Sequence, residues 1–322
     1  MANLFITGGA GFIGSALVRL VLDELPDCTV TNFDALTYAG NLDNLPGAEA
    51  TGRYRFIHGD IADRQAVLAA LEPNTDAIIN VAAESHVDRS ITSADAFLRT
   101  NVLGTQVLLD AARERRVGRF VQISTDEVMG SLSDDDTTFF TESSPFAPNS
   151  PYAASKAAAE HFVRAAHHTF GLDTVITRCG NNYGPRQFPE KLIPLLLANA
   201  MRDEPIPVYG DGRNVRDWIF VDDHCRAILS VLHKGRAGAV YNVGARNERR
   251  NIELVEAILT QLGKPLSLIR YVPDRLGHDR RYAIDPTKIE QELGWRPRET
   301  WQTGLAKTIQ WYQQNPRLRN GK

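Results

Sequence analysis

Two short polar runs hold residue types that could move protons on and off a substrate hydroxyl. Thr125, Asp126 and Glu127 stand side by side in the first run, and Tyr152 and Lys156 stand four residues apart in the second. A tyrosine that titrates at about pH 10 is a poor base at neutrality, but a lysine ammonium one helical turn away would lower its pKa. On its own this pair could equally be an ordinary tyrosine and a solvated lysine. Beside two adjacent carboxyl groups it indicates general acid–base catalysis.

The elements around these runs would bring them together. Residues 119–123 are an apolar segment typical of a buried strand, so the first run begins where a strand ends, and ligands bind there in open α/β sheets. The second run opens a helix, with Ser150 as a suitable N-cap and Pro151 at the first helical position. Adjacent strand residues face opposite ways, so both carboxyl groups can serve one sugar only beyond the strand tip.

The composition is that of an ordinary soluble globular protein. Of 322 residues, 43% are hydrophobic and 23% are charged, and the formal net charge of −3 favours neither nucleic acid nor a membrane as a partner. The three cysteines are far apart and no His-x-x-x-His pair occurs, so we expect no disulfide framework and no metal site. We find no signal peptide and no apolar run of membrane-spanning length, and therefore predict a cytoplasmic protein.

The beginning of the sequence carries a dinucleotide-binding pattern. After an apolar strand, Gly8, Gly11 and Gly14 lead into an apolar-periodic helix over residues 15–25. Such glycines permit a tight turn and let the backbone approach a pyrophosphate, which then lies at the helix N-terminus. Asp34 ends a second strand 20 residues past Gly14, where a carboxylate accepts the ribose hydroxyls and repels a 2′-phosphate. We therefore predict NAD rather than NADP.

Strands and helices continue to alternate to residue 180. This order predicts an α/β fold in which residues 1–180 form a Rossmann-like, doubly wound parallel sheet. Long helices are expected over residues 95–116 and 152–170. Residues 181–322 should form a smaller, mixed and discontinuous substrate-binding domain, with the chain returning to the sheet at about residues 216–234.

These motifs give the chain a resemblance to a known family. It is similar to the extended short-chain dehydrogenase/reductases, and among them to the nucleotide-sugar 4,6-dehydratases, over nearly its whole length. The glycine motif and the Tyr152/Lys156 pair mark only the superfamily, whereas the adjacent Asp126 and Glu127 mark the dehydratases. The matching segments are residues 7–14, 82–90, 124–130, 152–156, 181–185, 188–194, 216–218 and 277–282.

The resemblance implies a lyase that oxidises the sugar at C4, removes water across C5 and C6, and returns the hydride to C6. Tyr152 with Lys156 would be the base at O4, and Thr125 would hydrogen-bond that oxygen. Glu127 would remove the C5 proton, and Asp126 would protonate the leaving O6. Because Asp126 must then hold a proton near neutral pH, we expect it in a desolvated site or beside another negative charge.

The resemblance also implies binding residues and an assembly. The nucleotide sugar is expected to be dTDP-glucose, whose diphosphate suits bidentate arginines. The protein is expected to be a homodimer joined by a four-helix bundle of the two long helices from each subunit. NAD would be held by Gly8, Gly11, Phe12, Ile13, Gly14, Asp34, Thr37, Asp60, Ile61, Val81, Ala82, Ala83, Ser85, Thr100, Tyr152, Lys156 and Asn182. The nucleotide sugar would be held by Ser85, Thr125, Asn181, Lys191, Leu192, Pro207, Val208, Tyr209, Arg216, Asn251, Asp274, Arg275 and His278.

Two residues depart from the family pattern. Met129 stands where tyrosine is usual, and Leu276 stands where proline is usual in the loop around it. Neither is a proton-transfer group, so they affect the expected substrate more than the expected reaction. For three further polar residues, Glu84, His86 and Asp88, the favoured interpretation is a loop network that orders the site without reacting.

Two other functions compete with this interpretation. A UDP-sugar 4-epimerase or decarboxylase would share the fold, but neither reaction needs a C5 base together with an acid at the C6 hydroxyl. A non-catalytic NAD-binding sensor on the same fold would be expected to lack the Tyr152/Lys156 pair, which this chain retains. Fold alone would not separate these possibilities.

Overall fold

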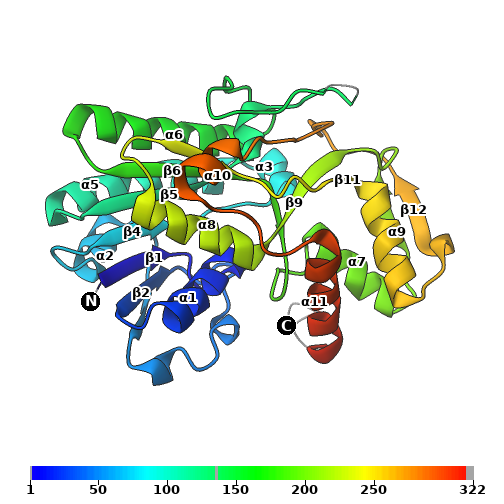
Figure 1. Cartoon of the computed structure of the whole chain (residues 1–322), viewed down its shortest axis with the longest axis horizontal. Helices are drawn as coiled ribbons and strands as arrows, with labels where there is room; N and C mark the ends of the chain where they lie inside the picture. Colours follow the sequence, from blue (N-terminus) through cyan, green and yellow to red (C-terminus); the bar gives the residue numbers. More distant parts are fainter. Residues whose placement is uncertain (1, 135–136, 317–322) are drawn as a thin grey trace.

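Seven parallel strands form the central sheet of the protein (Figure 1). The computed structural model describes residues 2–134 and 137–316. The strand order is β10-β6-β5-β4-β1-β2-β3, and every neighbouring pair is parallel. The strands are β1 (Ala2–Thr7), β2 (Cys28–Asp34), β3 (Tyr54–His58), β4 (Ala77–Asn80), β5 (Arg119–Thr125), β6 (Thr174–Cys179) and β10 (Val240–Val243). This arrangement confirms the predicted Rossmann-like, doubly wound fold.

Helices cover both faces of this sheet because each buries an apolar stripe against it. One face is covered by α1 (Phe12–Glu24), α8 (Val221–Lys234) and α10 (Thr287–Leu293). The other face is covered by α2 (Arg64–Ala70), α5 (Thr105–Arg115) and α6 (Pro151–Phe170). As predicted, Ser150 caps α6 by accepting a 3.1 Å hydrogen bond from the Ala153 N–H. Within the described ranges, no helix is long and apolar enough to cross a membrane.

The helix predicted over residues 95–116 is not regular. After α3 (Val87–Thr92), the short α4 (Asp95–Phe97) passes into a π-helical stretch, Leu98–Gly104, before α5 begins. There the buried Asn101 amide donates to Ser155 Oγ at 2.8 Å and to the Glu84 carbonyl at 3.0 Å. The wider π turn accommodates these tertiary hydrogen bonds, which an apolar periodicity cannot reveal.

The remaining elements build a smaller region, here called the small lobe, around an apolar cluster of its own (Figure 1). It contains a mixed three-stranded sheet, β11-β9-β7, and a parallel two-stranded sheet, β12-β8. Its strands are β7 (Asn181–Tyr183), β8 (Ile206–Tyr209), β9 (Val215–Phe220), β11 (Glu248–Arg250) and β12 (Ile269–Val272). Its helices are α7 (Leu192–Met201), α9 (Asn251–Leu262) and α11 (Trp301–Gln314).

Along the sequence, the elements of the small lobe are interrupted by a segment that returns to the central sheet. β9 leads directly into α8, and β10 then pairs with β6 as an edge strand. By these elements the return covers residues 221–243 rather than residues 216–234, because β9 pairs within the small lobe and a short strand follows α8. The chain returns a second time as α10. The division into domains at residue 180 stays a prediction.

A buried ion pair joins α6 to the central sheet. The Arg178 guanidinium, on β6, donates to both carboxylate oxygens of Glu160 at 2.8–3.1 Å, and the two side chains are only 4% and 2% exposed. Arg178 Nη1 also donates to the Glu142 carbonyl at 3.3 Å and lies 3.6 Å from Met129 Sδ. One side chain thus connects β6, α6 and the segment after β5.

We predict that Glu160→Gln destabilises the fold by about 3 kcal/mol or more, because it leaves the Arg178 charge buried without its counter-ion. Urea unfolding followed by circular dichroism measures the change. The control is Glu114→Gln, which breaks a pair with Arg64 whose side chains are 48% and 56% exposed and should cost less than about 1 kcal/mol. Equal effects of the two substitutions would contradict the assignment.

Candidate active site

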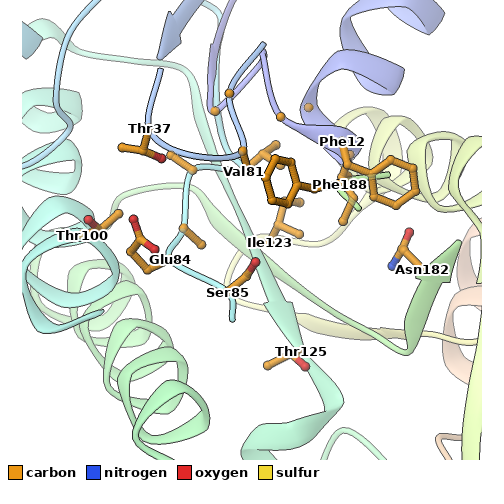
Figure 2. A pocket seen from close by; sticks show the side chains of 18 of the residues that line it. Phe12, Thr37, Val81, Glu84, Ser85, Thr100, Ile123, Thr125, Asn182 and Phe188 are labelled. Carbon is orange, nitrogen blue, oxygen red and sulfur yellow. The ribbon is translucent and has the colours of Figure 1, made fainter. Parts of the chain in front are cut away.

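A cavity of about 350 Å³ lies at the carboxyl ends of the central strands, where open α/β sheets bind ligands (Figure 2). Side chains from both halves of the chain line it: Figure 2 shows Phe12 and Thr37 from the first two crossovers together with Asn182 from β7. Every residue that we assigned to NAD lines this cavity, and so do all five residues that we assigned to catalysis. The structure therefore brings the two groups of residues together in one site.

The glycines of the first loop let the backbone pack more closely than any other residue would allow. Gly8 has a φ of +68°, and a β-carbon there would lie 2.7 Å from the Ala82 backbone. A β-carbon on Gly14 would lie 2.0 Å from the Gly8 carbonyl oxygen. Gly11 is the N-cap of α1, and no side chain caps that helix. The first N–H groups of α1 are thus available beside the cavity, as a pyrophosphate requires.

Asp34 lies at the end of β2 as predicted. Its Oδ2 accepts a hydrogen bond from the Ala10 N–H and its Oδ1 from the Leu36 N–H, both at 2.8 Å. Burial raises the pKa of this carboxyl group, and the two backbone hydrogen bonds oppose that rise. Each oxygen keeps a further lone pair for a ribose hydroxyl. The uncapped helix, the glycine cradle and this carboxyl group together fit a dinucleotide without a 2′-phosphate.

The two adjacent carboxyl groups reach the cavity because β5 stops at Thr125. The chain continues as a 3₁₀ turn, Asp126–Met129, and Gly130 follows with a φ of +84°. The Thr125 hydroxyl accepts the Glu127 N–H and lies within hydrogen-bonding distance of Asp126 Oδ1, both at 3.3 Å. In this turn the strand alternation no longer applies, so both carboxyl groups line the same cavity.

Burial sets the protonation of this pair. Asp126 is 1% exposed, and burial, reinforced by the charge of Glu127, raises its pKa well above the usual value while Arg216 opposes the rise. Burial also raises the pKa of Glu127, but three cations oppose it: Arg216, Arg275 and Lys191. Glu127 is therefore the group that ionises more readily, and Asp126 the group that keeps a proton. Within the described residues, Asp126 Oδ2 has no hydrogen-bond partner.

The tyrosine and the lysine are both buried, but they do not interact as expected. Lys156 Nζ donates a 2.6 Å hydrogen bond to the Ile123 carbonyl, and burial lowers its pKa to about 8. Burial, with the charge of Glu127, raises the pKa of Tyr152 well above its usual value. Among protein groups alone, then, desolvation is the main cause of both shifts, and the pKa of Tyr152 is raised rather than lowered.

The residues assigned to the nucleotide sugar fall into two groups. Ser85, Thr125, Asn181 and Lys191 line the cavity. The others belong to the small lobe, on β8, on β9, at the starts of α7 and α9, and in the loop after β12; they are Leu192, Pro207, Val208, Tyr209, Arg216, Asn251, Asp274, Arg275 and His278. The Val208 side chain packs into the apolar core of the small lobe, so a substrate contact from that side chain is not supported.

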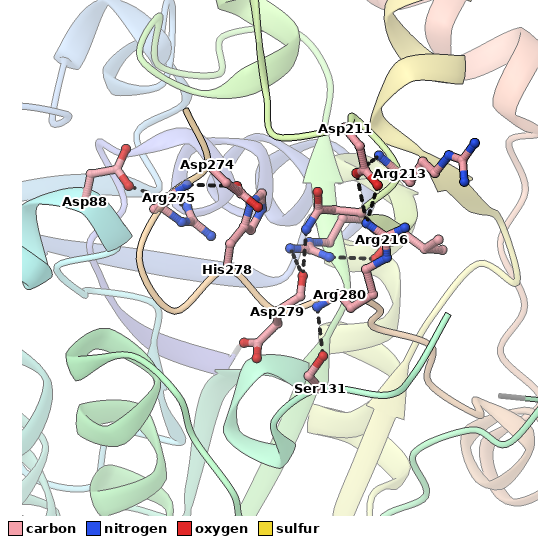
Figure 3. A network of polar contacts seen from close by, with 12 residues as sticks. Asp88, Ser131, Asp211, Arg213, Arg216, Asp274, Arg275, His278, Asp279 and Arg280 are labelled. Atoms are coloured by element: carbon pink, nitrogen blue, oxygen red, sulfur yellow. Dashed lines mark hydrogen bonds and ion pairs between the residues drawn. The ribbon is translucent and has the colours of Figure 1, made fainter. Parts of the chain in front are cut away.

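A polar network organises the loop after β12 (Figure 3). His278 Nδ1 lies 2.6 Å from Asp274 Oδ1, and Arg275 reaches to within 3.6 Å of Asp88 on α3. Arg216 donates to the Asp279 carbonyl at 2.9 Å. This network sets two guanidinium groups of the small lobe close enough to Glu127 to oppose the rise of its pKa that burial causes.

The two departures from the family pattern have different surroundings. Met129 is buried, with its sulfur 3.6 Å from Arg178 Nη1, so it belongs to the support of the catalytic turn. Leu276 is 76% exposed at the tip of the loop after β12, next to Gly277, which has a φ of +62°.

Sequence reasoning missed several residues that line the cavity. Tyr38, Phe188 and Glu190 carry ring or charged groups there, and Cys179 ends β6 beside Lys156. Glu84 also lines it; the sequence singled it out without giving it a ligand. Tyr38 follows the predicted Thr37, so adjacency was its only signal, whereas Phe188 and Glu190 belong to the matching segment 188–194 and could have been found from it.

Comparison with known proteins agrees with this site. The family model described as GDP-mannose 4,6 dehydratase matches residues 5–308. The chain is 53% identical to the dTDP-glucose 4,6-dehydratase of Xanthomonas campestris pv. campestris (strain B100), covering 98% of this chain and 94% of the relative.

Two solved structures extend the comparison. DesIV, a dTDP-glucose 4,6-dehydratase from Streptomyces venezuelae solved with NAD bound, is 52% identical over 97% of each chain, with a TM-score of 0.94. The dTDP-glucose 4,6-dehydratase of Bacillus anthracis, in complex with NAD, is 46% identical over the full length of both chains, with a TM-score of 0.91. These matches confirm the resemblance drawn from the motifs: the chain belongs to the family of nucleotide-sugar dehydratases described as GDP-mannose 4,6 dehydratase.

Proposed function

We propose that the protein is a lyase, an NAD-dependent dTDP-glucose 4,6-dehydratase that forms the 4-keto-6-deoxy sugar. The observation that carries this proposal is the turn after β5, where Asp126 and Glu127 line one cavity with Tyr152 and have pKa values set apart by their surroundings. A sugar dehydratase needs an acid and a base at neighbouring carbons, and this pair can supply both. The similarity to dTDP-glucose 4,6-dehydratases supports the substrate.

NAD would be held by the glycine loop, by Asp34 at the ribose and by the residues around Val81 and Thr100. The chemistry that it supplies when bound is reversible hydride transfer, first from C4 of the sugar and last to C6. The protein excludes water from the site, since Tyr152, Lys156 and Asp126 are each less than a tenth exposed. Exclusion of water strengthens every electrostatic interaction with the reacting sugar.

The side chains then divide the proton transfers. Tyr152 takes the proton of O4, while Thr125 hydrogen-bonds the same oxygen. Glu127, ionised with the help of three nearby cations, removes the C5 proton, which is acidic once C4 is a ketone, and returns a proton to C5 when hydride adds to C6. Asp126, whose buried Oδ2 has no partner in the described part of the chain, gives its proton to the leaving O6. Glu127 and Asp126 thus each act in the protonation state that their surroundings favour.

The alternative functions would not need both carboxyl groups of the turn. A 4-epimerase or a decarboxylase has no step that needs an acid at O6 with a base at C5, so it would leave the buried Asp126–Glu127 pair without a role. A non-catalytic sensor would not need an acid kept protonated beside a buried tyrosine and lysine. The pair therefore favours elimination of water.

We further infer a cytoplasmic homodimer of two-domain subunits. Large apolar side chains are exposed on the π stretch and on α6, among them Leu98, Leu103, Phe162 and Phe170. A second copy that packs α5 and α6 against their equivalents in a four-helix bundle would cover such side chains. The three cysteines are free and buried, as is common in reducing compartments.

We predict that the purified protein converts dTDP-glucose to dTDP-4-keto-6-deoxyglucose without added NAD. Product is assayed by the alkaline absorbance of the keto sugar, with UDP-glucose as the comparison substrate. Conversion to a galactose epimer would instead contradict the roles of Asp126 and Glu127. A faster reaction with UDP-glucose would change the assigned substrate but would leave the assigned reaction type as it is.

Two isosteric substitutions should separate base from acid. Glu127→Gln should lower kcat by about a hundredfold or more and abolish deuterium uptake at C5 from heavy water, while the absorbance of reduced nicotinamide still rises on mixing with substrate. Asp126→Asn should lower kcat similarly but leave deuterium uptake at C5, because the base remains. Mass spectrometry of recovered sugar gives the readout. Identical deuterium patterns in both variants would refute the division of roles.

The pH profile should report the raised pKa of Glu127. Since Glu127 must be ionised to act, kcat should fall as the pH drops through a pKa above the value of about 4.3 of a free glutamate. Arg275→Gln removes one cation that stabilises the carboxylate, so it should move this acid limb to higher pH at saturating substrate. A limb that stays in place or moves to lower pH would rule out this electrostatic role.

A further inference from the structure

Three segments that are far apart in the sequence meet beside the cofactor cavity. Tyr38 lies in the loop after β2, Arg89 lies on α3, and Phe188 lies in the segment that precedes α7. Tyr38 and Phe188 line the cavity, and Figure 2 shows Phe188 among its side chains. None of the three residues has a role in the proton transfers derived above.

These three side chains form one contact cluster. The Arg89 guanidinium carbon lies 3.8 Å from the centroid of the Tyr38 ring. The Phe188 ring meets the Tyr38 ring nearly edge-on, with centroids 5.5 Å apart and an interplanar angle of 80°. Both geometries are favourable, the first as a cation–π contact and the second as a T-shaped aromatic pair. The Tyr38 ring thus contacts both a cation and a second ring.

Polar contacts tie the same segments together. Arg89 Nη2 donates to Glu190 Oε2 at 2.9 Å, and His86 Nε2 lies 3.7 Å from that oxygen. Lys191 Nζ donates to the Ser85 carbonyl at 2.9 Å. The segment before α7 is therefore joined to the loop and helix after β4 at two successive residues, while Arg89 reaches the Tyr38 loop as well.

We propose that Tyr38, Arg89 and Phe188 form a clasp that retains NAD in the cavity. This inference rests on the proposed function, in which one cofactor serves both hydride transfers and need not leave between turnovers. Tyr38 and Phe188 line the cavity, and Arg89 holds both Tyr38 and Glu190 from α3. Separating these segments to release a dinucleotide therefore breaks the Tyr38 contacts and the Arg89–Glu190 ion pair together. The clasp acts on the rate of release and leaves the reacting atoms untouched.

The test is the rate at which the purified holoprotein loses NAD. Protein diluted into buffer with an enzyme and substrate that consume free NAD is sampled over time, and the NAD that remains bound is measured after filtration. Tyr38→Ala and Arg89→Gln should each release NAD about three- to tenfold faster than the wild type, because each loses the cation–π contact together with either the ring pair or the ion pair. Tyr38→Phe keeps the ring and should release NAD at nearly the wild-type rate.

Arg113→Gln is the matched control, because Arg113 makes a cation–π contact at 3.5 Å with Phe170, away from the cavity lining. It should release NAD as the wild type does, and thermal melting of each variant checks that it is folded. Wild-type release from folded Tyr38→Ala and Arg89→Gln would overturn the clasp alone, as would fast release from Tyr38→Phe or Arg113→Gln. Wild-type protein that purifies without NAD would overturn both the clasp and the retained cofactor of the proposed function.

Discussion

Two neighbouring carboxyl groups in a desolvated cavity cannot both ionise freely, and much of this structure follows from that constraint. Asp126 and Glu127 are consecutive residues at the end of a central strand, so covalent geometry alone keeps them close. The protein separates their pKa values by giving Glu127 more positive neighbours than Asp126. Without this difference the pair would offer one shared proton and no division between acid and base.

The positive charges that make this difference come mainly from outside the sheet. Arg216 lies on β9 and Arg275 in the loop after β12, so both belong to the small lobe, and Lys191 immediately precedes α7. The central sheet supplies the reactive groups and the dinucleotide cradle, while the small lobe supplies the field that tunes them. Arg275 also reaches Asp88 on α3, which joins the two parts of the molecule next to the site (Figure 3).

Buried contacts of Arg178 and Gly130 hold the turn Asp126–Met129 in place. The Arg178–Glu160 pair is buried below the surface, and the same guanidinium lies against Met129, the last residue of the turn. Gly130 follows with a positive φ of +84°. A β-carbon on this residue would lie 2.5 Å from the Ala147 carbonyl oxygen, so only glycine fits there. These contacts fix the direction of the chain after the strand, and so the direction of both carboxyl groups.

The sequence by itself determined the alternation of strands and helices, the glycine loop, the acid at the end of β2 and the residues of the catalytic turn, because each depends on local periodicity or on fixed spacing between neighbours. Tertiary structure alone decided the rest. The π stretch before α5 accommodates the buried hydrogen bonds of Asn101, and Lys156 donates a hydrogen bond to the Ile123 carbonyl. Charges from distant segments set the order of the pKa values of Asp126 and Glu127. Distant segments also bring Tyr38, Arg89 and Phe188 into contact. Spacing along the sequence does not predict such distances in space.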